Sequence, residues 1–334
     1  MAHIHFLARR LAWPGFLLLG LSGSALAFQS ASPIINFVLV YLGTFALIAL
    51  AERLLPFEQS WLESDGETLN DIGHTLLTKG VVEVLSGLGV VFPMLAAKVF
   101  AASQFLRIGG WPVHVPLPLQ VVLALIIAEF GLYWAHRLAH EHLNLWRFHA
   151  LHHSVERLWV VNTGRFHVVD SVFKITLSQV PLYLLGAPVE VFLWVGAVTA
   201  FIGILTHCNL DVVTGPLDYV FSTPRLHRWH HSLNLREGNS NYGENLVLFD
   251  QLFGTYFNPD RQPGTHIGIT GRIAKGFFAQ LAQPFSQKGR KQILGAKPKA
   301  YYEAQIAAEL EKERLEHFQE KRRPVFRLKM PRTK

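Results

Sequence analysis

The sequence predicts an all-α integral membrane protein, a helical bundle with a histidine-rich cap on its cytoplasmic side. Half of its 334 residues are apolar, its mean hydropathy is +0.24, and only 16% are charged, against about 25% in a typical soluble domain. Several apolar runs are long enough to cross a bilayer. Eleven of the seventeen histidines fall between His136 and His231, which points to a concentrated polar site beside those runs.

The first two apolar runs lie near the N-terminus. Arg9 and Arg10 precede a run that ends near Ala27, which is the layout of a secretory signal peptide with a small-x-small cleavage site. Residues 33–51 follow almost at once and carry no charge. For this reason we expect the first segment to stay as an uncleaved span, with cleavage of residues 1–27 as the alternative that the sequence leaves open.

Two further runs have the composition of membrane spans. Residues 80–97 tolerate one charge, Glu83, near their start, and residues 117–135 lead directly into the first histidines. About twenty apolar residues are needed to cross the hydrocarbon core. We therefore expect both runs to span the membrane, and the alternative is that they are buried helices of a soluble protein.

A broken apolar region follows the first histidine groups. It covers residues 172–205 and is interrupted by Pro181 and by Gly186-Ala187-Pro188. Proline inside a helix breaks or kinks it, so the pattern predicts two short helices that form a hairpin dipping into the membrane. Such a hairpin returns the chain to the side it left, which places His207 on the same side as His149–His153.

Lys and Arg placement sets the expected orientation. With Arg9 and Arg10 inside, successive spans bring the histidine region and the C-terminal tail to the cytoplasm. Residues 288–334 carry fourteen Lys/Arg and six Asp/Glu, whereas the rest of the chain is close to neutral. A basic tail of this kind favours anionic lipid as its partner, and without zinc-finger spacing we expect no nucleic-acid partner. Residues 301–323 are expected to form a solvated charged helix, and residues 244–257 an interfacial or packing helix.

Nine histidines are grouped at helical spacing. They stand as His136-x-x-x-His140, His149-x-x-His152-His153, the single His207, and His227-x-x-His230-His231. Residues i, i+3 and i+4 share one helical face, so each triplet aims three imidazoles in one direction. Neutral imidazole suits iron, zinc, copper and nickel. Nine are too many for one tetrahedral zinc but suit two metals with open positions. The only cysteine, Cys208, cannot supply a thiolate cluster.

Several neighbouring residues are weaker candidates. Asp211 follows His207 by one turn and is expected to accept its ring N–H, as carboxylates behind metal ligands do. Glu141, beside His140, is a second candidate acid. His142 and His167 are left open as further ligands.

At these residues the chain resembles the fatty acid hydroxylase/sterol desaturase superfamily of membrane di-iron enzymes. The boxes HRLAH, HALHH and HRWHH occur in order. The stretch HRLAHEHLNLWRFHALHHS resembles the alkylglycerol-monooxygenase-like branch, and TPRLHRWHHS, SNYGENL and FDQLFGTY resemble bacterial members. The resemblance covers roughly residues 115–260.

The resemblance implies a ligand set, two cofactor ions and a domain plan. The implied iron ligands are His136, His140, His149, His152, His153, His207, His227, His230 and His231. They would hold two iron ions and use O₂ as co-substrate. Membrane spans would occupy 1–116, the catalytic domain 117–260 and the basic tail 261–334. Because no His-Pro-Gly-Gly haem segment is present, electrons would come from a separate ferredoxin or cytochrome b5 type protein.

The sequence departs from the family pattern at two points. Some hydroxylases carry a second histidine where this chain has Asp211, which leaves one ligand position open. The segment Arg165-Phe166-His167 is usually followed by proline in the family, and here Val168 follows.

The function that these features predict is O₂-dependent hydroxylation or desaturation of a membrane lipid, whether fatty acyl, sterol or ether lipid. The compact form without a cytochrome domain favours a bacterial inner membrane. An aliphatic C–H bond offers no acid or leaving group, so a redox cofactor must carry the chemistry. The alternatives are a histidine-rich membrane metal transporter or metal-binding protein, a bis-histidine haem protein, and a member of the fold that has lost activity. Neither the substrate nor the oligomeric state follows from the sequence.

Overall fold

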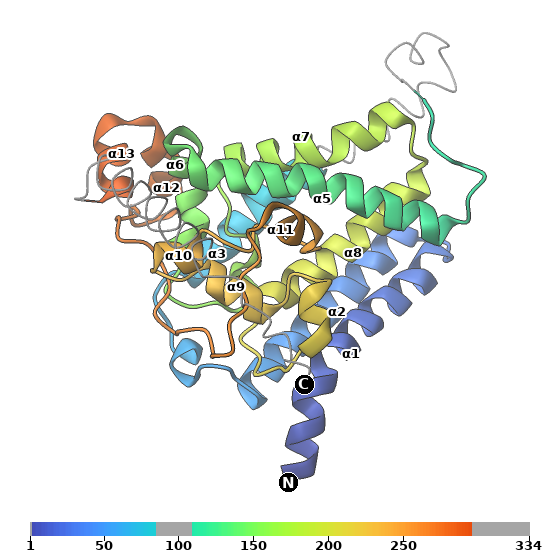
Figure 1. Ribbon diagram of the computed structural model, residues 1–334, viewed down its shortest axis with the longest axis horizontal. Coiled ribbons are helices and arrows are strands. Elements are labelled where there is room, and N and C mark those ends of the chain that lie inside the picture. Colours follow the sequence, from blue (N-terminus) through green and yellow to red (C-terminus); the bar gives the residue numbers. More distant parts are fainter. Residues whose placement is uncertain (1, 85–108, 296–334) are drawn as a thin grey trace, which may run out of the picture.

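The computed structural model describes residues 2–84 and 109–295, and over these residues it is built from helices and loops (Figure 1). Five helices are long and apolar enough to cross a membrane by length and composition. They are α1 (Ala2–Phe28), α2 (Pro33–Leu54), α5 (Leu117–Glu141), α7 (Val168–Leu185) and α8 (Val189–His207). The predicted all-α membrane architecture is therefore confirmed.

Shorter elements gather at one end of these long helices. Before α5 come η1 (Gln59–Leu62), α3 (Thr68–Gly73) and the π-helical turn η2 (His74–Gly80). After it come α6 (Leu143–His153), η4 (Val160–Gly164), η5 (Gly215–Tyr219), α9 (Pro224–His230), α10 (Leu235–Gly238), α11 (Leu248–Phe253), α12 (Phe277–Ala282), η6 (Gln283–Phe285) and α13 (Gln287–Leu294). Figure 1 shows α12 and α13 beside α6, at the end where α5 finishes.

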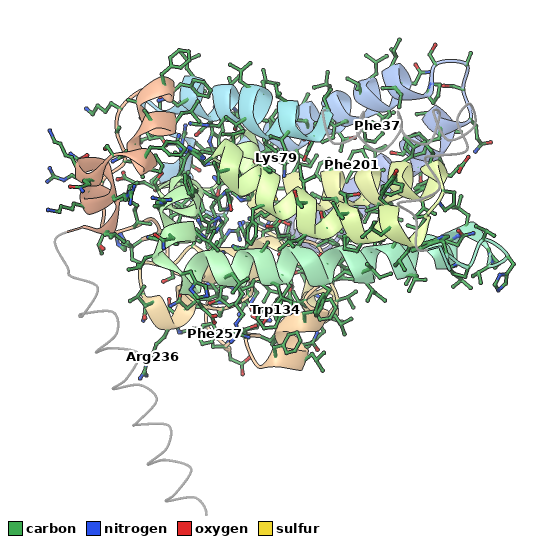
Figure 2. All side chains as sticks on the ribbon, turned by 90° about the horizontal axis from the view of Figure 1, so that it is seen from above. Phe37, Lys79, Trp134, Phe201, Arg236 and Phe257 are labelled. Atoms are coloured by element: carbon green, nitrogen blue, oxygen red, sulfur yellow. The ribbon has the colours of Figure 1, made fainter. Side chains whose placement is uncertain are left out.

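One core joins the two N-terminal helices to α8. Trp13 of α1, Ile48 of α2 and Phe201 of α8 are fully buried in it. Phe37 meets Phe201 edge to face with ring centroids 6.2 Å apart, a favoured aromatic geometry. Figure 2 shows this contact on the side of α5 opposite to Phe257. Many apolar residues of α1 and α2 outside this core, such as Leu18, Leu39 and Leu50, are exposed, as a lipid-facing surface requires.

A second core holds α5 against α7 and α8. Ala124, Leu182 and Val191, one from each helix, are completely buried there. The two helices α5 and α7 are in close contact at Gly131, where an added Cβ would lie 2.1 Å from the carbonyl oxygen of Leu177. Glycine is required at this crossing because any side chain would collide with backbone. This contact sets the position of the last turn of α5 relative to α7.

The predicted hairpin exists, but its arms are longer than expected. Helices α7 and α8 have 18 and 19 residues, each the length of a span, and Pro181 lies inside α7 without ending it. The turn is made by Gly186, whose φ of 84° is left-handed and closes α7. The expected break at Pro181 does not occur, because a proline can be kept inside a membrane helix that neighbouring helices hold.

Two other expected helices have different outcomes. Residues 244–257 form only the short helix α11 and not one continuous helix. The cause is that residues 245–247 pair with a different segment, since the Asn245 carbonyl accepts the Ser222 N–H and the Val247 N–H donates to the Val220 carbonyl. At the other end, Gly254 takes a left-handed φ of 72° and ends α11. Most of the expected span at 80–97, and all of the helix at 301–323, lie outside the described residues.

Candidate metal centre

Nine histidine side chains meet where α5, α6, α8 and α9 come together. They form two groups. Within each group, every ring has one nitrogen atom that lies within 4.8 Å of the corresponding nitrogens of the other rings. The five-histidine group consists of His136, His140, His149, His153 and His230, and the four-histidine group of His152, His207, His227 and His231. The structure thus brings together all nine residues that the sequence singled out.

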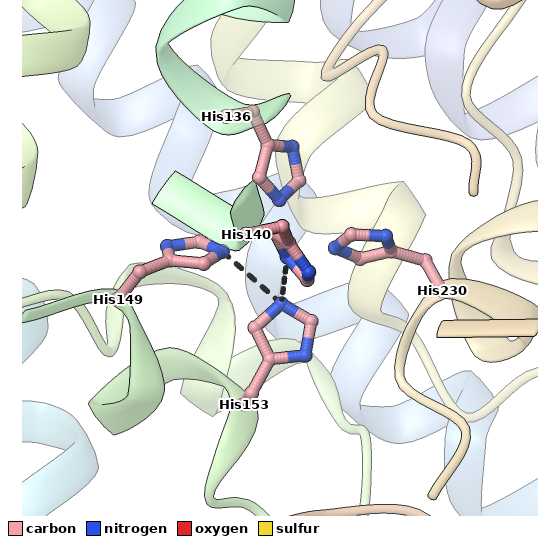
Figure 3. Close-up of side chains that lie close together, drawn as sticks. All are labelled: His136, His140, His149, His153 and His230. Carbon is pink, nitrogen blue, oxygen red and sulfur yellow. Dashed lines mark hydrogen bonds between the residues drawn. The ribbon is translucent and has the colours of Figure 1, made fainter. Parts of the chain in front are cut away.

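The five-histidine group converges on its Nε2 atoms (Figure 3). Nε2 of His153 lies 3.0 Å from Nε2 of His140 and 3.1 Å from Nε2 of His149. Nε2 of His136 and Nε2 of His230 are buried and have no hydrogen-bond partner. Buried polar atoms normally have partners, so these orphaned nitrogens fit a position that a metal ion occupies.

The four-histidine group repeats this convergence. Nε2 of His227 lies 2.9 Å from Nε2 of His207 and 3.0 Å from Nε2 of His231. Nε2 of His152 lies 3.3 Å from Nε2 of His231. The two groups touch, since the rings of His153 and His231 stack with centroids 4.4 Å apart. The arrangement suits two neighbouring ions.

Each histidine triplet contributes to both groups. His149 and His153, four residues apart, enter the five-histidine group, whereas His152 enters the other. His227 and His231 enter the four-histidine group, whereas His230 enters the first. Side chains at i and i+4 lie above one another on a helix while the one at i+3 is displaced around the axis. One short helix therefore serves two sites.

The outer nitrogens of the rings face oxygen acceptors. Nδ1 of His136 lies 2.8 Å from the Tyr242 carbonyl oxygen, and Nδ1 of His230 lies 2.7 Å from the Ser240 carbonyl oxygen. Nδ1 of His149 lies 2.9 Å from a carboxylate oxygen of Asp170. Side-chain amide oxygens face the other two, Asn162 at 3.1 Å from Nδ1 of His207 and Asn239 at 3.2 Å from Nδ1 of His140. An acceptor at Nδ1 holds the proton there and leaves Nε2 free to bind metal.

Burial also keeps these rings neutral. Among the group members outside the candidate spans, desolvation lowers the pKa of His149, His152, His153, His227, His230 and His231 below the usual value, to about 3 for His230. Neutral imidazole is the metal-binding form. Together with the orphaned Nε2 atoms, an all-nitrogen donor set without thiolate fits a redox metal such as iron.

The sequence reasoning missed a charged cluster behind the five-histidine group. Asp170 and Lys174, one turn apart on α7, are both buried, and Asp170 Oδ2 receives the Nδ1 proton of His149. Lys174 Nζ lies 4.4 Å from the ring centroid of Phe166, which stacks on His152 at 4.1 Å. Ionisable residues at the start of an apolar membrane run are functional candidates, and this signal was available in the sequence.

The loop at residues 239–247 completes the site from the other side. Asp250 accepts the N–H groups of Tyr242 and Gly243, at 2.7 Å each. Glu129, buried in α5, accepts the N–H groups of Glu244 and Asn245 at 2.7 and 3.0 Å. These bonds hold the loop so that its carbonyl oxygens reach the rings of His136 and His230.

The two acids singled out from the sequence lie elsewhere. Asp211 pairs with Arg9 at 2.8 Å, and the acceptor that we expected it to provide for His207 is supplied by Asn162. Asp211 was preferred only because it lies one turn from His207, but the chain leaves the helix at Cys208 and turns away. Glu141 is exposed and pairs with Arg137 at 2.7 Å.

The two histidines left open as ligands belong to neither group. His142 is exposed at the start of α6. His167 is buried, but Nδ1 accepts the Val169 N–H at the start of α7 and Nε2 donates to the Leu281 carbonyl. Its position is explained by these two contacts.

Comparison with known proteins places the site in context. Residues 121–255 match the fatty acid hydroxylase family model. The chain is 64% identical over 289 residues to an ornithine lipid hydroxylase, OlsE, of Rhizobium tropici, covering 86% of this chain and 87% of that protein. It is 29% identical to an alkylglycerol monooxygenase of Danio rerio over 61% of this chain and 45% of that protein. A human alkylglycerol monooxygenase is 32% identical over 40% and 29%. No solved structure matches the chain.

Proposed function

The chain belongs to the fatty acid hydroxylase family and is a membrane enzyme of the hydroxylase class, and from this premise we propose that its two histidine groups hold two iron ions. The observation that carries the proposal is the convergence of nine imidazoles into two adjoining groups. Iron bound there would supply the redox chemistry with O₂ that insertion into a C–H bond requires. The hydroxylase relatives leave the transporter alternative without support.

The protein's own residues prepare this centre. Tyr242 and Ser240 offer carbonyl oxygens, and Asp170 a carboxylate, to the outer nitrogens of three rings. Acceptors of this kind orient a ligand ring and increase its basicity. The centre is closed by buried side chains, with Phe166 covering His152. This burial excludes bulk water from the ligands.

We further propose that the substrate is an amino-acid-bearing membrane lipid. The support is the 64% identity to a protein named as an ornithine lipid hydroxylase. Five helices are long and apolar enough to cross a membrane, and the histidine groups lie at one end of them, which supports a substrate that enters from the bilayer. Hydroxylation is then favoured over desaturation or ether cleavage.

Electron supply and orientation complete the proposal. The family relation favours a separate ferredoxin or cytochrome b5 type donor. Lys/Arg placement favours a centre that faces the cytoplasm, and the relative from Rhizobium tropici favours a bacterial inner membrane. We also propose residues 117–260 as the catalytic domain, with membrane spans in residues 1–116 and a basic tail in residues 261–334.

The decisive experiment combines metal analysis with turnover. Purified protein is expected to hold about two iron ions per chain and, with ornithine lipid, reductant and isotopically labelled O₂, to yield a product with one labelled oxygen. His142→Ala, at an exposed position outside both groups, is the matched control for His152→Ala. Zinc in place of iron, or oxygen derived from water, would contradict the proposal.

A further inference from the structure

A buried ion pair borders the metal centre, and the mechanism above does not use it. Lys174 Nζ of α7 lies 2.5 Å from Glu244 Oε1 in the loop at residues 239–247. The same carboxylate oxygen is 3.9 Å from Nδ1 of His136. Lys174 also faces Phe166, which covers His152. The pair therefore adjoins ligands of both histidine groups.

The hydrogen-bonding capacity of this pair is not filled. An ammonium group has three donors, yet neither Lys174 Nζ nor Glu244 Oε1 makes a hydrogen bond of acceptable geometry, although both atoms are buried. Asp170, 3.9 Å from Nζ, is occupied by His149. A buried ion pair with unfilled capacity is weak as a stabilising device. Unfilled donors and acceptors beside a reaction centre suit a ligand.

One end of the pair is partly exposed. The side chain of Lys174 is 6% exposed, whereas that of Glu244 is 21% exposed, so the pair can be reached from the Glu244 side. Glu244 is held at its backbone by Glu129, which leaves only its side chain to move. A ligand can then separate the two charges without unfolding the loop.

The chemistry of the pair selects the ligand. A lone anion at Lys174 would leave the Glu244 carboxylate without its partner, and a lone cation at Glu244 would do the same to Lys174; each is unfavourable in a buried site. A hydrocarbon chain would leave both charges facing apolar groups. A ligand that carries both an ammonium and a carboxylate group replaces one ion pair with two.

We propose that Lys174 and Glu244 form the headgroup subsite of this enzyme, in which Lys174 binds the carboxylate and Glu244 the ammonium group of a zwitterionic amino-acid lipid. This inference rests on the proposed function and names the residues that select its substrate. The two residues are specificity determinants, and the histidine groups remain the metal centre.

The test compares two lipids within each variant. One is ornithine lipid, and the other is an analogue with the same acyl chains whose side chain lacks the amine. Binding of each to purified protein is measured by native mass spectrometry. We expect wild type to prefer ornithine lipid by about tenfold or more, the scale of one charged hydrogen bond. Glu244→Gln should abolish this preference, because it weakens the binding of ornithine lipid and leaves the binding of the analogue unchanged.

Two further variants keep the test decisive if one protein folds poorly. The double variant Lys174→Met/Glu244→Gln removes both charges of the proposed subsite and should bind both lipids equally. Lys288→Met removes an exposed lysine of α13 and should keep the wild-type preference. Because each result is a ratio between two lipids on one protein, the folded fraction cancels.

The outcomes separate this inference from the proposed function. If Glu244→Gln weakens the binding of both lipids equally, or of neither, the proposed subsite is overturned. A preference that is present in wild type and lost in Glu244→Gln supports the subsite, even if no oxygen enters either lipid; that last result would overturn the hydroxylase proposal instead.

Discussion

Asp170 accepts the Nδ1 proton of His149 at 2.9 Å, and both side chains are buried. Among the described histidines of the two groups, His149 is the one whose Nδ1 is hydrogen-bonded to a carboxylate, whereas the other Nδ1 acceptors are carbonyl or amide oxygens. A carboxylate can only accept, so it fixes the tautomer of His149 and makes its Nε2 more basic. The strength of the five-histidine group should therefore depend on this contact.

Asp170→Asn tests that dependence. We expect metal affinity of the five-histidine group to fall by about 10–100-fold, the usual effect of losing a partner behind a metal ligand, while the four-histidine group keeps its metal. Competition with a chelator, followed by elemental analysis, measures both. Asp211→Asn, which removes the partner of Arg9, should leave both affinities unchanged. A loss in Asp211→Asn equal to that in Asp170→Asn would contradict this assignment.

The division of each triplet between two groups predicts separable metal loss. His140→Ala removes a member of the five-histidine group, and His152→Ala a member of the four-histidine group. Each should retain about one metal ion per chain and lose at least about a hundredfold in activity, because first ligands matter more than their partners. Elemental analysis and turnover check this. Loss of both metals from each variant would show that the groups bind as one unit.

Much of this site could be predicted from the sequence, because helical spacing alone aims three imidazoles from each triplet. The division into two groups was not predicted, since it depends on how α6 and α9 are rotated against their neighbours. The pairing of Asn162 with His207, where Asp211 was expected, depends on where the chain turns after Cys208. The spacing of residues along one helix gives no information about such long-range contacts.

The fold was predicted where it depends on apolar length and less well where it depends on specific contacts. The apolar runs at 33–51 and 117–135 were predicted from composition alone, and they form most of α2 and α5. The expected helix at 244–257 was wrong because its first residues bond to distant segments: Glu129 binds the N–H groups of Glu244 and Asn245, and the Asn245 carbonyl accepts the Ser222 N–H. Side chains distant in sequence thus override local propensity, and Gly131 shows the same point at a helix crossing.

Gly131→Ala should destabilise the bundle. The new methyl group would meet the Leu177 backbone at 2.1 Å, and forcing extra volume into a packed contact costs about 1–3 kcal/mol. Gly43→Ala is the matched control, because nothing lies within 4 Å of its Cβ position on α2. Thermal unfolding in detergent measures both, and equal midpoints for the two variants would argue against close α5–α7 packing.

The segment at residues 271–295 should be needed for the site, whereas residues 296–334 should not. Leu281 accepts from His167 at 3.0 Å, and Gln280 bonds to both His74 and Glu67 at 2.8 and 2.9 Å. A chain ending at residue 295 keeps these contacts and should retain its metals. A chain ending at residue 270 loses them and should hold less metal. Metal loss from the longer chain would assign a structural role to the tail.

The burial of His74 also predicts a pH dependence of stability. Burial lowers the pKa of His74 to about 4, against about 6.5 when unfolded. Between these values the unfolded chain takes up a proton that the folded protein does not, so stability falls as the pH drops from about 6.5 toward 4. The loss from this group is at most about 3 kcal/mol.

His74→Gln tests this origin, because it keeps a polar side chain that does not titrate. The free energy of unfolding of metal-free wild type and of metal-free His74→Gln is measured at several pH values across this range. The difference between the two proteins isolates His74, because they share all the other histidines. A smaller decline in His74→Gln confirms the origin, and identical declines would assign the effect to the metal-site histidines.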